Sequence, residues 1–422
     1  IPAHTAFAET SPATEIKPAS TPWLYENSDV PVDQSWTFGV LDNGLRYAVK
    51  RNIVPAGQVS IRVRVDAGAL HEEDNELGFA HLMEHLAFRG SEHVPEGEAK
   101  RIWQRFGVSF GSDSNAQTTP TQTVYKLDLP NSSPATLDES LKILAGMVRA
   151  PNISESALNA GRAIVQAELR ESAGAGMDLG EAMRQHAFQG QRLAKRSTIG
   201  TLESLDSASA AGLKEFHRRW YRPEKMVVSI AGDADPKELE RLVREHFGEW
   251  KGRRAPAPDP DFGRPNPKGT VAKTVVEPTL PPNVALIYAR PWEKVADTIA
   301  YNEQLLVDAL AQQIVNRRLV TQARAGSTFS VAEVAQEDIS RSADTTTVII
   351  TPIGDNWQKA VVDVRAIIAD ATTTPPSAAD IERELALFGN ALRTMRDSYP
   401  FEAAAKQADD IVKAVDIRET IA

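Results

Sequence analysis

Cysteine is absent from this chain of 422 residues. Its absence excludes disulfides, zinc sites built from thiolates and nucleophilic catalysis by cysteine. Any bound metal must therefore be held by histidine, aspartate or glutamate. Histidine is itself scarce, with 8 residues in the whole chain, so two histidines close together in the sequence are informative.

Long apolar runs and an excess of positive charge are also lacking. No uninterrupted apolar stretch reaches the length that crosses a bilayer, so we expect no transmembrane segment. The formal net charge is -10, which argues against nucleic acid as a partner because phosphate binding needs clustered lysine and arginine. The remaining composition is that of a soluble globular protein, long enough for at least two domains.

The first 35 residues are rich in proline, alanine, serine and threonine and show little apolar periodicity. We interpret residues 1–35 as an extended leader ahead of the fold, with Trp23 and Trp36 anchoring it. The chain begins at Ile1 rather than methionine, as it would after removal of an export signal. We therefore expect a bacterial periplasmic or cell-envelope location.

A proline-rich stretch divides the rest of the chain. Residues 251–270 hold five prolines, at 256, 258, 260, 265 and 267, and such a density is incompatible with a helix or a central strand. The order strand, helix, two strands, two helices is predicted on both sides of it. We infer an α+β fold of two homologous domains, 36–250 and 271–422, each a mostly antiparallel sheet covered by helices on one face. The second domain is expected to lack its last elements.

Apolar periodicity and turn residues predict the individual elements. In the first domain they predict strands at 45–49, 59–65, 108–114, 121–129 and 226–231, and helices at 75–88, 135–149, 154–172 and 236–247. In the second they predict strands at 284–289, 328–334 and 346–353, and helices at 297–323, 357–371 and 377–397. The acidic run 72–74 is interpreted as a solvated turn and the start of a helix, and His71 as a surface or loop residue.

The most informative motif is His81-Leu82-Met83-Glu84-His85. Residues i and i+4 share one face of a helix, so His81 and His85 can bind the same ion. Glu84 borders that face and can reach a metal-bound water as general base. This is the HxxEH order of the inverzincins. The alternative is a helix whose polar stripe holds these residues by chance.

A catalytic zinc site normally has three protein ligands, and with no cysteine a carboxylate is the natural third. The predicted helix 154–172 offers Glu155, Glu168 and Glu171. Glu168 lies among apolar residues and is expected to be buried, where a metal ion would offset the cost of its charge. On spacing alone, an ordinary salt-bridged acid explains Glu168 equally well. Glu171, one turn later, is expected to contact solvent or one of the metal-binding side chains rather than the metal itself.

Residues 36–250 resemble the N-terminal domain of the insulinase/pitrilysin family, which includes the mitochondrial processing peptidases. The resemblance covers Leu41-Asp42-Asn43-Gly44-Leu45, the HxxEH motif, Ser114-Asn115-Ala116, and the ending Phe247-Gly248-Glu249-Trp250. It implies the mitochondrial processing peptidase/LuxS-like metallohydrolase fold and one Zn2+ per chain, with Glu168 as third ligand. It also implies that Asn115 and Ala116 bind substrate as an added strand.

The family resemblance further implies an endopeptidase that cleaves unfolded peptides or small proteins inside a clamshell chamber. Catalytic members place an Arg and a Tyr seven residues apart in the domain facing the metal. Here the matching stretch runs from Arg318 to Phe329, with a different spacing and Phe for Tyr. This pattern is similar to the first half of long bacterial envelope members. We therefore expect a second clamshell half, either covalently continued or a partner chain.

Two departures from the family pattern concern the metal site. The interval from His85 to Glu168 is longer than usual, which we assign to an insertion around residues 131–136. Gly161 stands where relatives carry a second glutamate. Two other functions stay open: a non-catalytic structural or partner subunit of the same fold, and a dedicated leader-peptide processing protease.

Overall fold

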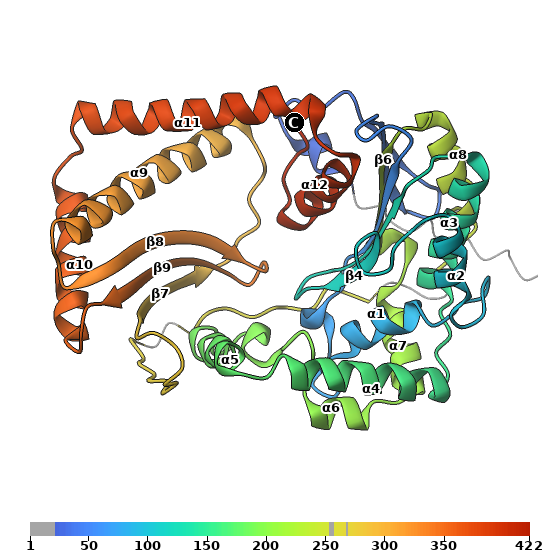
Figure 1. The fold of residues 1–422 in the computed structure, drawn as a ribbon, viewed down its shortest axis with the longest axis horizontal. Helices are drawn as coiled ribbons and strands as arrows, with labels where there is room; N and C mark the ends of the chain where they lie inside the picture. Colours follow the sequence, from blue (N-terminus) through green and yellow to red (C-terminus); the bar gives the residue numbers. More distant parts are fainter. Residues whose placement is uncertain (1–21, 253–256, 267–268) are drawn as a thin grey trace, which may run out of the picture.

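The computed structural model describes residues 22–252, 257–266 and 269–422. Two sheets with their helices form the body (Figure 1). The first domain contains the strands β1 (Thr37–Val40), β2 (Arg46–Arg51), β3 (Val59–Val65), β4 (Ser114–Thr118), β5 (Thr123–Leu129) and β6 (Met226–Gly232). Its α-helices are α1 (Phe79–Ala87), α2 (Glu98–Arg105), α3 (Pro134–Arg149), α4 (Glu155–Glu171), α5 (Ala175–Ala187), α6 (Leu202–Ser207), α7 (Ala210–Trp220) and α8 (Pro236–Phe247). Short 3-10 turns lie at Leu24–Asn27, Ala69–His71, Arg192–Lys195 and Pro223–Lys225.

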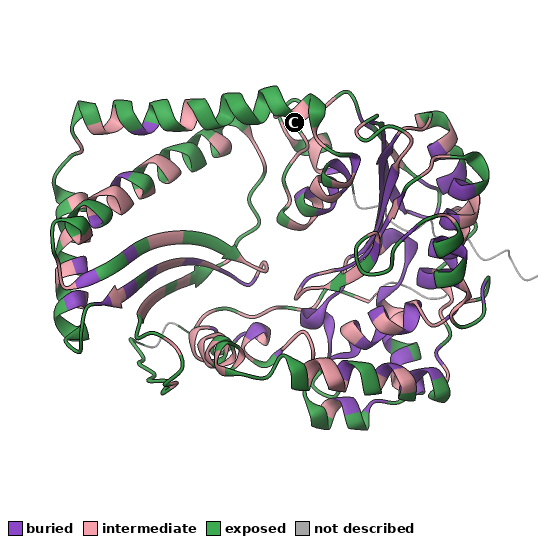
Figure 2. Ribbon diagram, in the orientation of Figure 1, coloured by how far each residue is buried: buried purple, intermediate pink, exposed green. Residues whose placement is uncertain are grey.

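The first sheet has six strands in the order β1-β2-β6-β3-β5-β4. Only β2 and β6 run parallel, and every other neighbouring pair is antiparallel. β3 and β6 are buried along their whole length (Figure 2), because helices pack on both of their faces. The strand β4 lies at the edge of this sheet, beside α1.

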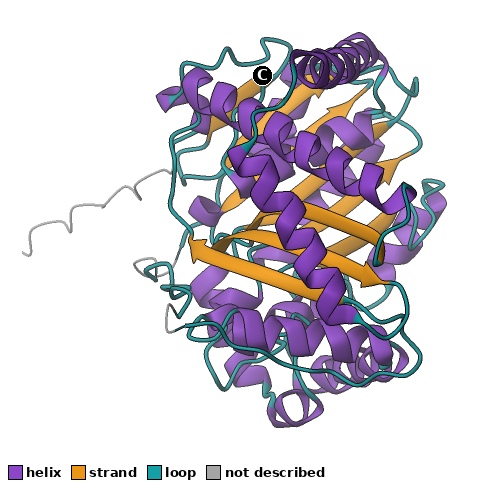
Figure 3. Cartoon of the chain, turned by 90° about the vertical axis from the view of Figure 1, so that its left-hand side faces the viewer, coloured by secondary structure: helices purple, strands orange, loops and turns teal. Residues whose placement is uncertain are grey.

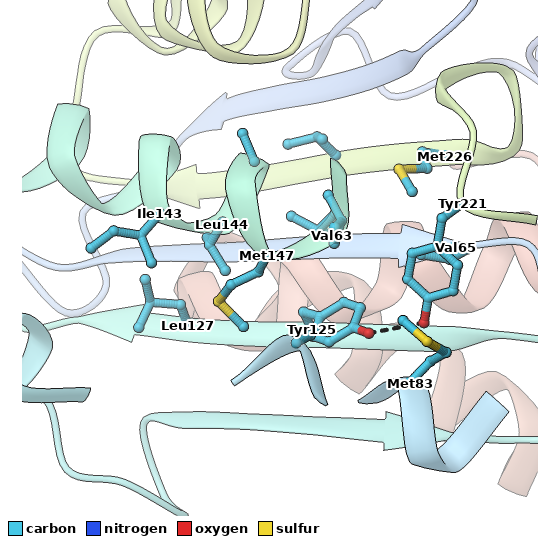
Figure 4. Packing of buried hydrophobic residues seen from close by; sticks show 14 of the residues in the cluster. Val63, Val65, Met83, Tyr125, Leu127, Ile143, Leu144, Met147, Tyr221 and Met226 are labelled. Atoms are coloured by element: carbon cyan, nitrogen blue, oxygen red, sulfur yellow. Dashed lines mark hydrogen bonds between the residues drawn. The ribbon is translucent and has the colours of Figure 1, made fainter. Parts of the chain in front are cut away.

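Helices α1, α3, α7 and α8 pack their apolar sides onto one face of the first sheet in a single core cluster. Within it Met83 of α1 joins Tyr125 and Tyr221, whose hydroxyls are 2.9 Å apart (Figure 4). A buried Tyr hydroxyl needs a hydrogen-bond partner, and this pair satisfies that need mutually. α1 is therefore held against the sheet by apolar contacts on the side opposite its histidines.

The second domain contains β7 (Val284–Pro291), β8 (Phe329–Ile339) and β9 (Ala343–Pro352), in the order β7-β9-β8 and entirely antiparallel. Its helices are α9 (Ile299–Arg324), α10 (Trp357–Thr373), α11 (Ala378–Ser398) and α12 (Ala404–Ile417), with a 3-10 turn at Tyr399–Phe401. When the molecule is viewed from the side of the second domain, helices lie in front of the strands (Figure 3). The mixed α+β architecture predicted from the sequence is confirmed.

The position of α12 differs from the one that the predicted domain division implies. It falls within 271–422, yet it packs on β3 and β6 of the first sheet, on the face opposite α1. Its Asp409 pairs with Arg62 at 2.8 Å, and its Asp416 with Arg64 at 3.1 Å. The first sheet is thus covered on both faces rather than on one. The strands carry charged residues on this second face, so the sequence pattern indicated a face exposed to solvent.

The leader and linker boundaries also differ from the structure. Residues 1–21 lie outside the described residues, but Trp23 and Trp36 are buried in a cluster with α12. The fold therefore begins before residue 36. In the linker, residues 257–266 form no helix or strand, and Phe262 packs edge-on against His71. Among the described residues, no helix is both long and apolar enough to cross a bilayer.

Candidate metal centre

The helix α1 carries the HxxEH motif, and it begins at a tightly packed glycine. Gly78 has φ +87, and a Cβ there would lie 3.0 Å from the carbonyl oxygen of Ile199. Only glycine fits this left-handed, crowded position without strain. Glu72 completes the helix start, since its two carboxylate oxygens accept hydrogen bonds from the N–H groups of Gly78 and Ala80, at 3.0 and 2.9 Å.

Glu72 corrects one expectation from the sequence. The run 72–74 was predicted to be a solvated turn, but Glu72 is fully buried. A buried carboxylate is tolerated where several N–H groups donate to it. His71, predicted at the surface, is also buried, and its Nδ1 accepts from the N–H of Gly68 at 3.1 Å. Both residues stabilise the approach to α1.

The two histidines and Glu168 of α4 come together in space. His81 Nε2 and His85 Nε2 are 3.2 Å apart, and Glu168 Oε2 lies 3.6 and 3.4 Å from them. A point equidistant from three atoms at these separations is about 2.0 Å from each, which is the length of a zinc bond to nitrogen or carboxylate oxygen. The arrangement therefore fits an ion of this size.

Two electrostatic features agree with this fit. Burial lowers the pKa of His81 to about 4 and lowers the pKa of His85, so both rings are neutral near pH 7 and keep a nitrogen lone pair for a metal. Two neutral nitrogens and a carboxylate form a donor set that zinc accepts. The Nε2 of His81 faces His85 and Glu168, while its Nδ1 is buried with no hydrogen-bond partner among the described residues.

Glu168 is less buried than its apolar neighbours predicted. Its side chain is 41% exposed, and Ile164 one turn before it is also exposed. Only Val165 in this stretch is fully buried. The burial argument for choosing Glu168 was therefore wrong, since the site opens to solvent on this side. Its proximity to both histidines is what singles it out.

Glu84 lies beside the same three groups but in a different environment. One of its carboxylate oxygens lies within 4.8 Å of a ring nitrogen of His81 and of His85. Its Oε2 accepts a hydrogen bond of 2.5 Å from the hydroxyl of Thr118 on β4. The pKa of Glu84 is raised to about 7: burial raises it most, the hydrogen bond from Thr118 opposes the rise, and the nearby charge of Glu168 adds to it. A carboxyl group with such a pKa can both accept and release a proton near neutral pH.

The edge strand β4 carries the predicted substrate-binding residues. Asn115 is exposed, Ala116 is half-buried, and the N–H of Ala116 donates to Asn115 Oδ1 at 2.9 Å. Within the described structure, β4 has one strand partner, β5. On its other edge Ser114 forms a bridge with Phe110, but from Asn115 to Thr118 no described strand pairs with that edge, as strand addition by a peptide requires.

Three further expectations fall around α4. Glu171 is exposed at the last residue of the helix, so its placement favours the solvent contact. Gly161 is buried against Leu86 of α1, 3.5 Å from where its Cβ would be. Four residues connect β5 to α3, and the insertion relative to the family around residues 131–136 stays a prediction.

Neither the contact of Thr118 with Glu84 nor that of Glu72 with the start of α1 was predicted from the sequence. Neither contact can be read from local periodicity, because each joins segments brought together only by the sheet. One signal was present for Glu72, namely its position six residues before Gly78, at the turn that starts the histidine helix.

A two-domain α+β fold with an HxxEH helix next to an edge strand defines the class of inverted-motif metallopeptidases. A model of the insulinase family (peptidase family M16) matches residues 47–201, and a model described as the peptidase M16 inactive domain matches residues 207–388. These two matches cover more than half of the chain. The chain therefore belongs to the insulinase family.

Individual relatives agree with this assignment. The probable zinc protease PqqL of Escherichia coli is 27% identical over 362 residues, which are 82% of this chain and 37% of that protein. The probable zinc protease PqqL of Haemophilus influenzae is 31% identical over 226 residues, covering 54% of this chain and 24% of that protein. The chain thus spans well under half the length of these two curated relatives.

The fold is shared with a solved relative. The first half of the periplasmic protease PqqL from Escherichia coli superposes with a TM-score of 0.80 at 24% identity, covering 93% of this chain and 84% of that chain. The full PqqL structure gives the same score, with 44% of that chain covered. The expected likeness to the N-terminal half of a long family member is confirmed.

Proposed function

We propose that this chain is the metal-binding half of a zinc-dependent endopeptidase that cleaves unfolded peptides or small proteins. His81, His85 and Glu168 would hold one Zn2+, and Glu84 would act as general base. The observation that carries the proposal is the convergence of three donor atoms within 3.6 Å of one another, with Glu84 beside them. Zinc protease relatives support the identity of the metal.

A zinc ion bound there would polarise the scissile carbonyl and acidify a water molecule. Glu84 would take a proton from the attacking water while the oxygen of that water adds to the carbonyl carbon. Glu84 then delivers the proton to the nitrogen of the leaving amine as the C–N bond breaks. Thr118 holds one oxygen of Glu84 in place, so that the other is free for the proton.

The peptide would lie along the open edge of β4, at Asn115 and Ala116. Strand addition uses backbone hydrogen bonds, so it predicts broad tolerance of side chains. Since the chain matches the first half of a longer fold, we propose that a second half faces this one across the substrate. The likeness to PqqL also supports a bacterial periplasmic location.

The test is Glu84→Gln in the protein at its natural length, assayed on unstructured peptides. We expect cleavage to fall at least about 100-fold while bound zinc, measured by elemental analysis, stays at one per chain. Glu203→Gln changes an exposed acid on α6 and should leave both values unchanged. Cleavage that persists in Glu84→Gln would contradict the proposed base. A parent protein that binds zinc but cleaves no peptide would favour the non-catalytic subunit.

A further inference from the structure

The turn between β8 and β9 has an unusual backbone. β8 ends at Ile339 and β9 begins at Ala343, and the N–H of Ser342 donates to the carbonyl oxygen of Ile339 at 2.9 Å. The two residues inside this turn, Ser340 and Arg341, have φ values of 53° and 54°. A tight turn with two left-handed residues usually contains asparagine and glycine, because other residues are strained there. A strained residue persists where the surrounding contacts fix it.

The side chain of Arg341 provides such contacts, and they reach into the first domain. The β8–β9 hairpin points toward that domain (Figure 1). Nη2 of Arg341 donates to Oδ1 of Asp66 and to the carbonyl oxygen of Thr121, both at 3.3 Å. It also lies 3.6 Å from Oδ1 of Asp416 on α12. The Arg341 side chain is only 9% exposed, and a guanidinium removed from water needs acceptors of this kind.

Asp66 is shared by arginines of the two domains. Nη2 of Arg64, on β3, lies 2.9 Å from Oδ1 of Asp66, the same oxygen that accepts from Arg341. Burial alone would raise the pKa of Asp66, but the charges of Arg64 and Arg341 lower this pKa well below its usual value. Asp66 is therefore ionised at neutral pH, and the contact between the domains is a true ion pair.

The backbone around Arg341 is docked as well. The buried Gln191 donates from Nε2 to the carbonyl oxygen of Ser342 at 2.5 Å. Ala343 is fully buried in a cluster that includes Leu70 and Leu193 of the first domain. Hairpin tips normally lie in solvent, so this tip is built as a contact rather than as a free loop.

Asp66 begins the segment that leads to the histidine helix. It directly follows β3. Six residues later, Glu72 accepts hydrogen bonds from the N–H groups of Gly78 and Ala80 at the start of α1. A displacement of Asp66 would therefore be passed on to the helix that carries His81.

Thr121 lies in the turn on the other side of the metal centre. It follows Thr118, the last residue of β4, by three positions, and the hydroxyl of Thr118 holds Glu84. This turn is also bonded to the segment after β3, because the N–H of Ala69 donates to the carbonyl oxygen of Thr119 at 3.1 Å. Arg341 thus clamps a junction from which both α1 and β4 extend.

We propose that Arg341 is a positioning residue of the metal centre, through which the second domain holds α1 and β4 at a fixed separation. The second domain, in which the described residues include no group of candidate metal ligands, thereby contributes to the geometry of the site. The effect on catalysis rests on the function proposed above, whereas the effect on backbone motion does not.

The alternative is a contact that only joins the two domains. Arg341→Gly separates the two roles, because glycine favours the left-handed turn while the guanidinium is lost. Ser340→Gly is the matched control, since it relieves the same turn and keeps Arg341. Arg341→Lys keeps the charge but loses the fork of donors that can bind two acceptors at once.

Hydrogen exchange in the protein at its natural length is the first test. In Arg341→Gly we expect the amides of residues 66–72 and 118–122 to exchange at least about tenfold faster than in the parent, while those of β6 stay unchanged. Ser340→Gly should match the parent, and Arg341→Lys should recover part of the protection. Equal exchange in the two glycine variants, or a uniform increase over the whole protein, would overturn the proposal.

Kinetics on unstructured peptides is the second test. In Arg341→Gly, kcat should fall about tenfold with KM nearly unchanged, because the reacting groups are displaced. Combined with Thr118→Val, the loss should stay well below the product of the two single losses, since both substitutions act on the position of Glu84. Fully multiplicative losses would overturn the proposal. An inactive parent would count against the proposed endopeptidase, while the exchange test of Arg341 would still decide this inference.

Discussion

The two domains share an order of elements but differ in packing and chemistry. In the first, β3 is buried throughout and supports a helix with two histidines and a glutamate. In the second, β7 is only partly buried, and α9, at the position of α1, contains no histidine. Both groups of candidate metal ligands found among the described residues lie in the first domain. The candidate site thus lies on the domain whose strands are more fully buried, and such a rigid support favours precise ligand geometry.

The largest expected difference concerns the two equivalent strands. Ile61 on β3 is fully buried, and Ile287 on β7 is half-buried. Ile61→Ala should lower the free energy of unfolding of the 422-residue chain by about 3 kcal/mol, and Ile287→Ala by about 1 kcal/mol. Denaturant unfolding of the two variants measures this. Equal losses would show that the second domain is as tightly packed as the first.

The metal-free protein should show a pH dependence that originates in Glu84. Burial raises its pKa from 4.5 to about 7, so between these values the native state binds more protons than the unfolded state. Stability therefore falls as pH rises through this window. Glu84→Gln removes that loss, and at pH 8 with chelator it should be more stable than the parent by at most about 3 kcal/mol.

Thermal unfolding of the parent and Glu84→Gln at pH 4 and pH 8 checks the sign. Burial of His81 and His85 acts in the opposite direction, since lowered histidine pKa values make stability rise with pH from about 4 toward 6.5. This contribution is present in both proteins and cancels in the difference. A variant that is less stable than the parent at pH 8 would refute the assigned environment of Glu84.

A smaller effect should separate two neighbouring acids before α1. Glu72→Ala removes the acceptor for two buried N–H groups and should cost about 2 kcal/mol. Glu73→Ala removes an exposed partner of Arg192 and should cost less than about 0.5 kcal/mol. Because Glu72 holds the start of the histidine helix, its loss should also weaken zinc binding, which chelator competition can measure. Similar losses of stability and zinc affinity in the two variants would indicate instead that Glu72 lies in a solvated turn, as predicted from the sequence.

The smallest expected effect is at Thr118. Thr118→Val keeps the shape of the side chain but removes the hydroxyl that donates to Glu84. In the protein at its natural length, kcat should fall about tenfold with KM nearly unchanged, since one positioned hydrogen bond is lost. Thr118→Ser retains the hydroxyl and should recover most of the rate. A change confined to KM would place Thr118 in substrate binding instead.

Local patterns predicted much of the fold. The helix α8 has the predicted bounds because Asp235 caps it and Pro236 starts it. The helix α1 begins four residues later than predicted, since Gly78 adopts a left-handed conformation that the apolar pattern does not reveal. The expected strand 108–114 was misplaced, and β4 begins only at Ser114, because Gly107 and Gly111 turn the chain before it.

The site was only partly readable from the sequence. The spacing of His81 and His85 fixes their common face on any helix, so their pairing was predictable. The assignment of Glu168 as the third ligand depended on the family resemblance. With 82 residues between it and His85, no local spacing connects the two, and its apolar neighbours wrongly predicted that Glu168 is buried. The position of α12 on the first sheet depends on pairs such as Arg62 with Asp409, which no local pattern encodes.

The most direct measurement is anomalous scattering at the zinc edge from crystals of the protein at its natural length. We predict one peak per chain, about 2.0 to 2.2 Å from His81 Nε2, His85 Nε2 and a carboxylate oxygen of Glu168. A peak elsewhere, or one bound by both histidines while Glu168 points away, would contradict it.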